Sequence, residues 1–526
     1  MSTPPEPAAR GPVSWRGGSL LGRARVAARA RRSSLAFVVL VLVPVAVLAA
    51  ALHRRGISWG DDFALYVRQA RSLGDGNVGQ VIADNRVNVE LAAKPGFSPY
   101  VYPWGFPLLL APFVRWWWPD VERLRLVEVA CWCGFLGFWF GVLRRRMAAW
   151  LALVTVAASG YSIAYLRHTG SILSELPFMA LLAGTIWYVD RITGRSDQPD
   201  QPDRPVVSWA AIERGRLIVL GLLMMLLFNT RREGLAVVPA VLALQVLECR
   251  GSRSIVARWR QLVLPHATFL VSVVAFQLVL PSALAPAYAG SGLGQTWRKL
   301  RTTFQASFVD QLGFHPLGAA SRLAIGVVVM IGIIVRLRRH ARADLGLLVY
   351  AAVSLVIVGM IPADADRYTM AVTPFAVYFG VQALAAVPRS KAVLGGAAAV
   401  LLLGANLVDL PAAVRQTNDA NRDGSVQTGP DEATSREMFA AVRAHTHYDD
   451  IVGFFKGRAL TLYTDRRAVQ SKDLSLILQR ADYFVMGRTA GVGIPNLTDA
   501  QAATAGLEEV WSNSAWVLYR VPQTGS

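Results

Sequence analysis

The chain has 526 residues, of which 53% are hydrophobic and only 17% are charged, and its formal net charge is +19. A soluble globular chain of this length is normally richer in charged residues, so the composition indicates a polytopic membrane protein built from helices. The positive charge gathers beside apolar runs, where membrane topology places it, which argues against a surface for binding nucleic acid.

Residues 1–33 hold seven arginines among many Pro, Ala and Gly residues and predict a disordered basic tail in the cytoplasm. Residues 34–410 are predicted to form a transmembrane domain, because they contain apolar runs of about 15–20 residues, the length of a helix that crosses a bilayer. About eleven spans are expected: Ser34–Leu52, Leu124–Leu143, Ala148–Leu166, Ser174–Tyr188, Leu217–Thr230, Gly234–Cys249, Leu262–Leu280, Leu323–Val335, Leu345–Ile361, Met370–Val387 and Val393–Leu410.

The charges support this arrangement. If the tail is inside and the spans alternate, every strong basic cluster lies on the cytoplasmic side, including the triplet Arg144, Arg145 and Arg146. The result requires that Tyr102–Pro119, a short segment rich in Pro and Trp, lies at the membrane surface. If that segment crossed the membrane instead, the arginine triplet would be outside.

Several segments are then expected outside, among them the first loop, 53–123, and the whole C-terminal part, 411–526. The C-terminal part is more polar, and it predicts a small α/β domain with a helix in "TSREMFAAVRAH", strands in "DIVGFF" and "ADYFVMG", and a hairpin around Asn513 and Ser514. The fold class is therefore an all-α membrane protein with interfacial helices and a small extracytoplasmic α/β domain.

Two adjacent carboxylates, Asp61 and Asp62, follow the first span directly. The next residues place an apolar stripe on one helical face, which predicts an amphipathic helix at the membrane interface. One aspartate would suffice to cap this helix and to complement its dipole. The second carboxylate is then free for chemistry next to the membrane.

A third acid, Glu175, lies at the outer edge of a predicted span, where an ionisable side chain is costly and marks a candidate functional site. Capping by Ser174 or Glu175, or pairing with the nearby Arg167 and His168, would be a purely structural explanation. Cations on the same side are Arg367, Lys94 and Arg231. A guanidinium matches phosphate oxygens in a bidentate way, so Arg367 is a candidate phosphate ligand, although a surface salt bridge is the simpler alternative.

Five segments resemble motifs of lipid-dependent glycosyltransferases of the GT-C superfamily, in the same order along the chain. They are "DDFALYVRQARSL", "YVYPWGFPLLLAPFVRWWWP", "SELPFMALLAG", "TRREGLAVVPAVL" and "DRYTMAVTPF". The C-terminal "GRALTLYTDRRAV" and "ADYFVMG" are similar to the extracytoplasmic domain that many members carry. The branch with the protein O-mannosyltransferases and aminoarabinose transferases is the most similar.

The resemblance implies transfer of a sugar from a polyprenyl-phosphate donor, usually with inversion, on the outer face of the cytoplasmic membrane. It implies that Asp62 is the catalytic base, with Asp61 as a cap or auxiliary acid and Glu175 in the second acidic position. The donor phosphate would be bound by Arg367, Lys94 and Arg231. The side chains expected to line the substrate site are Tyr66, Tyr102, His168 and Tyr368.

Some relatives use a divalent metal beside these acids, in which case Asp62 and Glu175 would be its ligands; the sequence leaves this open. The acceptor could be a glycan, a lipid or a protein. A transporter or flippase of a lipid-linked sugar would also need many spans with charges at their ends. A non-enzymatic scaffold of the envelope is a third alternative, although it would not need the acids.

Overall fold

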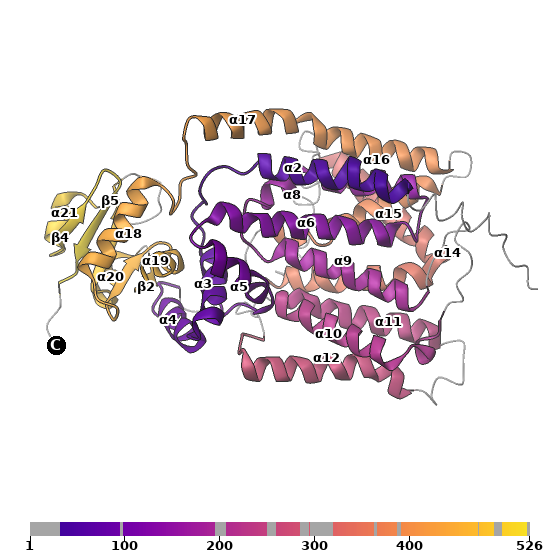
Figure 1. The fold of residues 1–526 in the computed structure, drawn as a ribbon, viewed down its shortest axis with the longest axis horizontal. Coiled ribbons are helices and arrows are strands. Elements are labelled where there is room, and N and C mark those ends of the chain that lie inside the picture. The colour runs from indigo at the N-terminus through magenta and orange to yellow at the C-terminus, as the bar shows by residue number, and fades with distance from the viewer. Residues whose placement is uncertain are drawn as a thin grey trace, which may run out of the picture.

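A computed structural model describes residues 32–94, 98–194, 207–249, 259–284, 294, 319–361, 366–386, 391–471, 473–488 and 497–522. The tail predicted at 1–33, apart from its last two residues, and most of the outer loop after Leu284 lie outside these residues. The described chain is mostly helical (Figure 1). A bundle of long helices forms one part, and a region with a small β-sheet lies beyond one end of it.

The bundle contains the described helices α2, α6–α12 and α14–α16. The chain enters it through a helix at Arg32–Ala51, whose last part is α2 (Val43–Ala51), and leaves it through α17 (Leu410–Arg422), which leads toward the sheet region (Figure 1). The remaining bounds are α6 (Val121–Leu143), α7 (Ala149–Gly160), α8 (Ile163–His168), α9 (Glu175–Ile192), α10 (Arg214–Thr230), α11 (Val237–Cys249), α12 (Trp259–Val279), α14 (Ala319–Gly359), α15 (Thr373–Ala385) and α16 (Lys391–Val408).

Five described helices are long and apolar enough to cross a membrane: Arg32–Ala51, Val121–Leu143, Trp259–Val279, Leu323–Gly359 and Val393–Arg422. Large apolar side chains on them are exposed, for example Leu278 at 82% and Val47 at 61%, as expected for surfaces that face lipid. A multi-pass membrane protein is thus supported. The expected number of about eleven spans is not confirmed and stays a prediction.

The spans expected at Leu323–Val335 and Leu345–Ile361 both correspond to α14, and non-helical backbone at His340, where φ is −139° and ψ is 37°, divides that helix in the gap between them. The predicted division is therefore present. The span expected at Ala148–Leu166 is divided into α7 and α8 at Tyr161 and Ser162. Hydropathy does not locate this second break, because it depends on backbone conformation within a continuous apolar segment.

The first loop forms three helices at the end of the bundle: α3 (Asp61–Asp75), α4 (Val78–Glu90) and α5 (Gly105–Trp117). The predicted apolar stripe of α3 is buried, but it packs on α5 and on the C-terminal region. This helix is therefore held by protein on both sides. With 13 residues, α5 is about 20 Å long, which is shorter than the roughly 30 Å of a bilayer core and agrees with a segment that does not cross.

The C-terminal region holds a five-stranded sheet of order β2-β1-β3-β5-β4, in which β1 pairs in parallel with β2 and β3, and β5 pairs antiparallel with β3 and β4. The helix, the two strands and the hairpin predicted here are all present, whereas β2 was not predicted. The elements are α18 (Ala433–His445), β1 (Ile451–Phe454), α19 (Gly457–Thr464), β2 (Arg467–Gln470), α20 (Leu474–Arg480), β3 (Tyr483–Gly487), α21 (Asp499–Thr504), β4 (Glu508–Ser512) and β5 (Trp516–Arg520).

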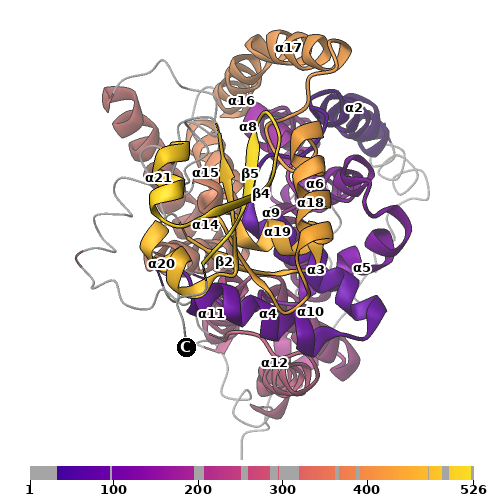
Figure 2. The ribbon, with the colours of Figure 1, turned by 90° about the vertical axis from the view of Figure 1, so that its left-hand side faces the viewer.

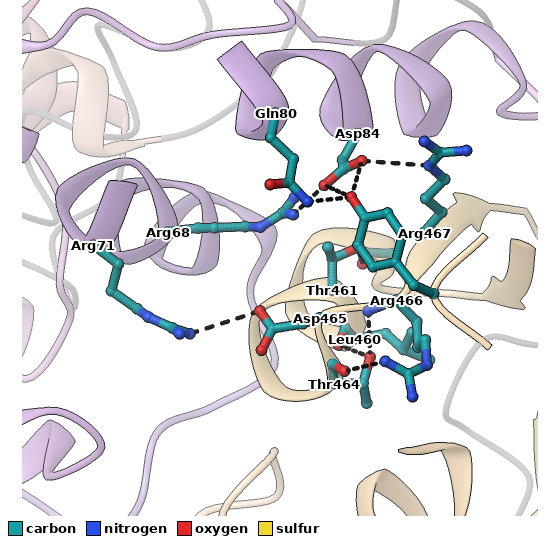
Figure 3. Close-up of polar contacts among 12 residues, drawn as sticks. Arg68, Arg71, Gln80, Asp84, Leu460, Thr461, Thr464, Asp465, Arg466 and Arg467 are labelled. Atoms are coloured by element: carbon teal, nitrogen blue, oxygen red, sulfur yellow. Dashed lines mark hydrogen bonds and ion pairs between the residues drawn. The ribbon is translucent and has the colours of Figure 1, made fainter. Parts of the chain in front are cut away.

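The sheet region is joined to the first loop by apolar and ionic contacts. Figure 2 shows the arrangement of the two parts, and Figure 3 shows polar contacts between them. Trp59 packs edge-on against aromatic rings of the sheet region, including Phe454 and Trp516, at centroid distances of 5.6 and 5.8 Å. Asp84 of α4 is buried and contacts Arg68 of α3 and Arg467 of β2. These contacts bring the start of α19 close to the start of α3.

Candidate active site

A cavity of about 550 Å³ lies where the end of the bundle, the first loop and the sheet region meet. Most of its wall comes from the start of α3, the segment before α5, the turn before α9 and the turn after α10. Five cationic and four acidic side chains are among its described lining residues: Arg231, Arg232, Arg367, Lys456 and Arg458, and Asp61, Asp62, Glu175 and Glu233. An excess of one positive charge favours an anionic ligand.

Asp62 occupies the first turn of α3 and faces this cavity. Its carboxylate accepts a hydrogen bond from the Tyr102 hydroxyl at 2.6 Å and one from the Arg367 guanidinium at 2.5 Å. Burial raises the pKa of Asp62, but the charge of Arg367 and the hydrogen bond from Tyr102 outweigh it, so its pKa lies below the usual value. Asp62 is therefore ionised at neutral pH.

The other aspartate of the pair, Asp61, is in a different environment. One of its carboxylate oxygens lies 3.4 Å from the Lys456 ammonium, and the other, Oδ1, is buried and has no hydrogen-bond partner within the described part of the chain. Burial raises the pKa of Asp61, against the opposing effect of Lys456. The proposed cap is wrong for both aspartates, because Gly60 is the N-cap of α3 and no side chain caps it.

Glu175 is the first residue of α9. Pro177 fits in the same first turn, because the backbone N–H groups of that turn have no partner within the helix and proline has no N–H to satisfy. The Glu175 side chain is 4% exposed and lies 2.8 Å from Arg231 and 3.5 Å from Arg367. Capping by Ser174 or Glu175 is not observed. Instead, Ser174 contacts the hydroxyl of Tyr66 at 2.9 Å and accepts a hydrogen bond from Arg231 at 3.1 Å.

Arg367 links the two acids. Its guanidinium lies between Asp62 and Glu175, and Tyr368 packs against both Arg367 and Arg231, with its ring centroid 5.4 and 5.5 Å from their guanidinium carbons. Arg231 directly follows α10, and its backbone is extended, with φ −148°. The short 3-10 helix Arg232–Ala236 comes next. Side chains that are far apart in sequence thus form one continuous network of charges.

The structure brings together most of the residues that were predicted from sequence. Asp61, Asp62, Glu175, Arg231, Arg367, Tyr66, Tyr102 and Tyr368 all line the cavity. His168 lies behind it, with Nε2 3.7 Å from Glu175. Lys94 is exposed and is not among the described lining residues, so its assignment to the donor phosphate stays a prediction without geometric support.

Sequence reasoning missed four charged residues of this site, and two of them, Lys456 and Arg458, flank Gly457 at the start of α19. Both residues follow strand β1 within four positions, and this place in a turn was the only local feature of the sequence that could have marked them. Glu233, which is 2.9 Å from Arg231, and Arg232 were also not assigned. The missing information was the packing of the sheet region on α3, which no local pattern reveals.

Asp62 and Glu175 were named as possible ligands of a divalent metal, but their surroundings do not suit one. Arg367 contacts both carboxylates and supplies positive charge between them. Within the described residues, no group of three or more His, Cys, Asp or Glu side chains is arranged to hold a metal ion. The chemistry considered below therefore takes no step through a metal.

No protein-family model and no curated protein sequence matches this chain. Solved structures do: ArnT from Cupriavidus metallidurans in the apo state aligns with a TM-score of 0.52 at 15% identity, over 93% of this chain and 98% of that chain. The fold is that of ArnT. The structure of ArnT bound to undecaprenyl phosphate gives a TM-score of 0.53 with the same identity and coverage.

A third structure, archaeal oligosaccharyltransferase AglB from Archaeoglobus fulgidus with an inhibitory peptide and a dolichol-phosphate, aligns with a TM-score of 0.49 at 11% identity. It covers 92% of this chain and 74% of AglB. The ArnT alignment alone carries the fold assignment. The ArnT fold agrees with the fold that the resemblance of the sequence motifs implies.

Proposed function

We propose that the protein is a glycosyltransferase of the cytoplasmic membrane that transfers a sugar from a polyprenyl-phosphate donor to an acceptor on the outer face. The observation that carries the proposal is the network in which Arg367 contacts both Asp62 and Glu175 at the wall of a 550 Å³ cavity. The ArnT fold supports the reaction class, and the undecaprenyl phosphate bound in one ArnT structure supports a lipid-phosphate donor.

The lining of the cavity suits such a donor. Arg231 and Arg367 lie on one side of it and can share a phosphate through charge-assisted hydrogen bonds. Ile357 and Ile361, at the end of α14, give the cavity an apolar wall that suits the first units of a polyprenyl chain. Tyr66 and Tyr102 also line the cavity, and the Tyr102 hydroxyl donates to Asp62.

In the proposed reaction, the acceptor hydroxyl oxygen attacks the anomeric carbon of the donor sugar. The bond between that carbon and the phosphate oxygen breaks, and polyprenyl phosphate leaves with the bonding electron pair. Asp62 takes the hydroxyl proton, while Arg367 and Arg231 stabilise the negative charge that develops on the leaving phosphate. Attack on the face opposite the leaving group inverts the anomeric configuration.

Arg367 connects donor binding to the base. Without a donor, its charge is shared by Asp62 and Glu175, which lowers the pKa of Asp62. A phosphate that binds Arg367 takes part of that charge, so the basicity of Asp62 rises when the donor is present. The base is thus strongest in the complex in which it is needed.

The outward orientation of the site rests on the arginine triplet. It follows the end of α6, a helix of 23 residues and about 35 Å whose other end lies beside the cavity. Basic clusters favour the cytoplasmic side, so the cavity faces outward. Reporter fusions at Arg145 and Ser526 should report opposite sides of the membrane, and a report of the same side for both would contradict this orientation.

The function is tested by incubating the purified protein in liposomes with a panel of radiolabelled undecaprenyl-phosphate sugars and with glycan, lipid and peptide acceptors. We expect transfer from one donor to one acceptor class, with an inverted anomeric carbon in the product. Movement of a labelled lipid-linked sugar between leaflets without transfer would contradict the proposal and favour a flippase.

A further inference from the structure

The sheet region contributes to the wall of the candidate active site. Lys456 and Arg458 at the start of α19 line the cavity together with the first loop, although more than 350 residues separate them from Asp62 in the chain. Arg458 is 3% exposed, so its charge is held inside the protein. Such a burial is costly unless the guanidinium is fully engaged.

The three nitrogens of Arg458 each donate to a different group of the first loop. Nε donates to the Asn85 side chain at 2.9 Å, Nη1 donates to the Tyr102 hydroxyl at 2.8 Å, and Nη2 donates to the Pro99 carbonyl at 3.1 Å. The guanidinium also lies over the Tyr102 ring, 5.1 Å from its centroid. Both the position of the Tyr102 ring and the orientation of its hydroxyl therefore depend on Arg458.

The Tyr102 hydroxyl passes this constraint on to Asp62. It accepts a hydrogen bond from Arg458 and donates its own proton to Asp62 at 2.6 Å. A hydroxyl that accepts from a cation is a stronger donor, because hydrogen bonds in a chain polarise one another. The only proton of the hydroxyl is thereby directed at the carboxylate.

Close packing fixes the turn that carries Arg458. A Cβ atom at Gly457 would approach the Asn88 side-chain nitrogen to 2.2 Å, so the turn lies against the Asn88 side chain of α4, and a larger residue would have to displace that side chain. Arg68 and Arg467 contact Asp84 on the same helix (Figure 3). These contacts hold the start of α19 against the first loop.

We propose that Arg458 is a positioning residue for transfer: it holds Tyr102, and through Tyr102 it holds Asp62 in the orientation that accepts the acceptor proton. This inference rests on the proposed function and gives the sheet region a part in the reaction. Arg458 touches neither the donor nor the acceptor in this role. Its loss therefore lowers kcat and leaves the KM for the donor nearly unchanged.

The test is a double-mutant cycle in the transfer assay, with Arg458→Met, Tyr102→Phe and the combination of both. A misplaced catalytic group costs up to about a hundredfold in rate, so we expect each single variant to lower kcat by about tenfold to a hundredfold. Because Arg458 acts through the Tyr102 hydroxyl, the double variant should be no slower than the slower single variant. Arg458→Lys should recover part of the rate.

The matched control is Arg520→Met, because Arg520 lies on β5 in the same C-terminal region, is 54% exposed at its side chain and pairs only with the exposed Glu508 among the acids of the described chain. It should transfer like the parent. If Arg458→Met does not fold, the same cycle is measured with Arg458→Lys, which keeps the charge and loses the planar fork.

The outcomes separate this inference from the function on which it rests. A parent protein that transfers no sugar contradicts the proposed function. A parent that transfers, with Arg458 variants that keep its kcat, contradicts the positioning role alone. Losses that multiply in the double variant, or a loss that falls on the donor KM, would also overturn it, because they would show that Arg458 acts independently of Tyr102.

Discussion

Two of the buried ionic clusters among the described residues lie near opposite ends of α6, one at the cavity and one near the arginine triplet. In the second, called here the distal cluster, Arg146 contacts Asp190 at 2.5 Å and Asp344 at 3.1 Å, and Arg336 and Tyr378 also contact Asp344. All four carboxylate oxygens of Asp190 and Asp344 accept hydrogen bonds. At the cavity, in contrast, Asp61 Oδ1 is buried without a hydrogen-bond partner among the described residues, and Glu175 Oε2 has only His168 nearby, at 3.7 Å, beyond hydrogen-bond distance.

The empty volume beside the distal cluster is also much smaller than the empty volume beside the cluster at the cavity. The void that Arg146 and Asp190 line is about 40 Å³, whereas the cavity beside Asp62 is about 550 Å³. A saturated cluster in a closed space holds helices together. An unsaturated cluster beside a large cavity retains binding capacity for a ligand, and we infer that this difference separates the structural ion pairs of this chain from the functional ones.

The largest effect on stability is expected in the distal cluster. Arg146→Met leaves the buried Asp190 without its ion pair, and removing one partner of a buried pair costs about 3–5 kcal/mol. Arg144→Met is the matched control, since it removes the same charge from the same triplet, and the Arg144 side chain donates to an exposed serine hydroxyl and lies over the Phe140 ring, with no ion pair among the described residues. Thermal unfolding in detergent should show a large loss for Arg146→Met alone. Equal melting temperatures for the two variants would refute the structural role.

A smaller effect on stability and a large effect on binding are expected at Arg367. Arg367→Ala should weaken binding of a polyprenyl-phosphate sugar by about tenfold or more, because hydrogen bonds to charged groups contribute about 1.5–3 kcal/mol each. Arg367→Lys should restore part of the affinity, since lysine keeps the charge but lacks the planar fork. The measurement is equilibrium binding of labelled donor to purified protein. An unchanged affinity in Arg367→Ala would remove this residue from the site.

The smallest effect is expected from metal removal. Arg367 already supplies the positive charge between Asp62 and Glu175, so treatment with EDTA should leave the transfer rate within about twofold of the untreated protein. The rate is measured before and after dialysis against the chelator, with and without added Mg²⁺ or Mn²⁺. Loss of transfer that a divalent cation restores would contradict the arrangement of charges described here.

The sequence predicted those features that depend on local patterns. The stripe on α3 follows from residues spaced along one helix, and the strands β1 and β3 and the terminal hairpin follow from short apolar runs and a turn. The acids at Asp62 and Glu175 were conspicuous because charge at the edge of an apolar run is costly. The structure places these two side chains on one cavity, and their roles stay proposals.

Features that depend on packing between distant segments could not be predicted. In the sequence, Arg458 does not differ from a surface arginine of an α/β domain. Its position in the cavity follows only from the packing of α19 on α3. Arg146 served as a topology signal in the sequence, and its ion pair with Asp190 depends on the approach of two helices. The sequence also did not show that Asp61 is no cap, because the cap position depends on backbone conformation and falls at Gly60. Both carboxylates are therefore free for contacts in the cavity.

The central claim is that Asp62 is the base, and the most direct test is the transfer rate of Asp62→Asn beside Asp61→Asn, with thermal stability measured in parallel. Asparagine keeps the size of the side chain and cannot take a proton at neutral pH, so Asp62→Asn should lose about a hundredfold or more while remaining folded. Asp61→Asn should lose less, because its carboxylate is not hydrogen-bonded to Tyr102 or Arg367. A folded Asp62→Asn protein that transfers sugar as fast as the parent would contradict the account.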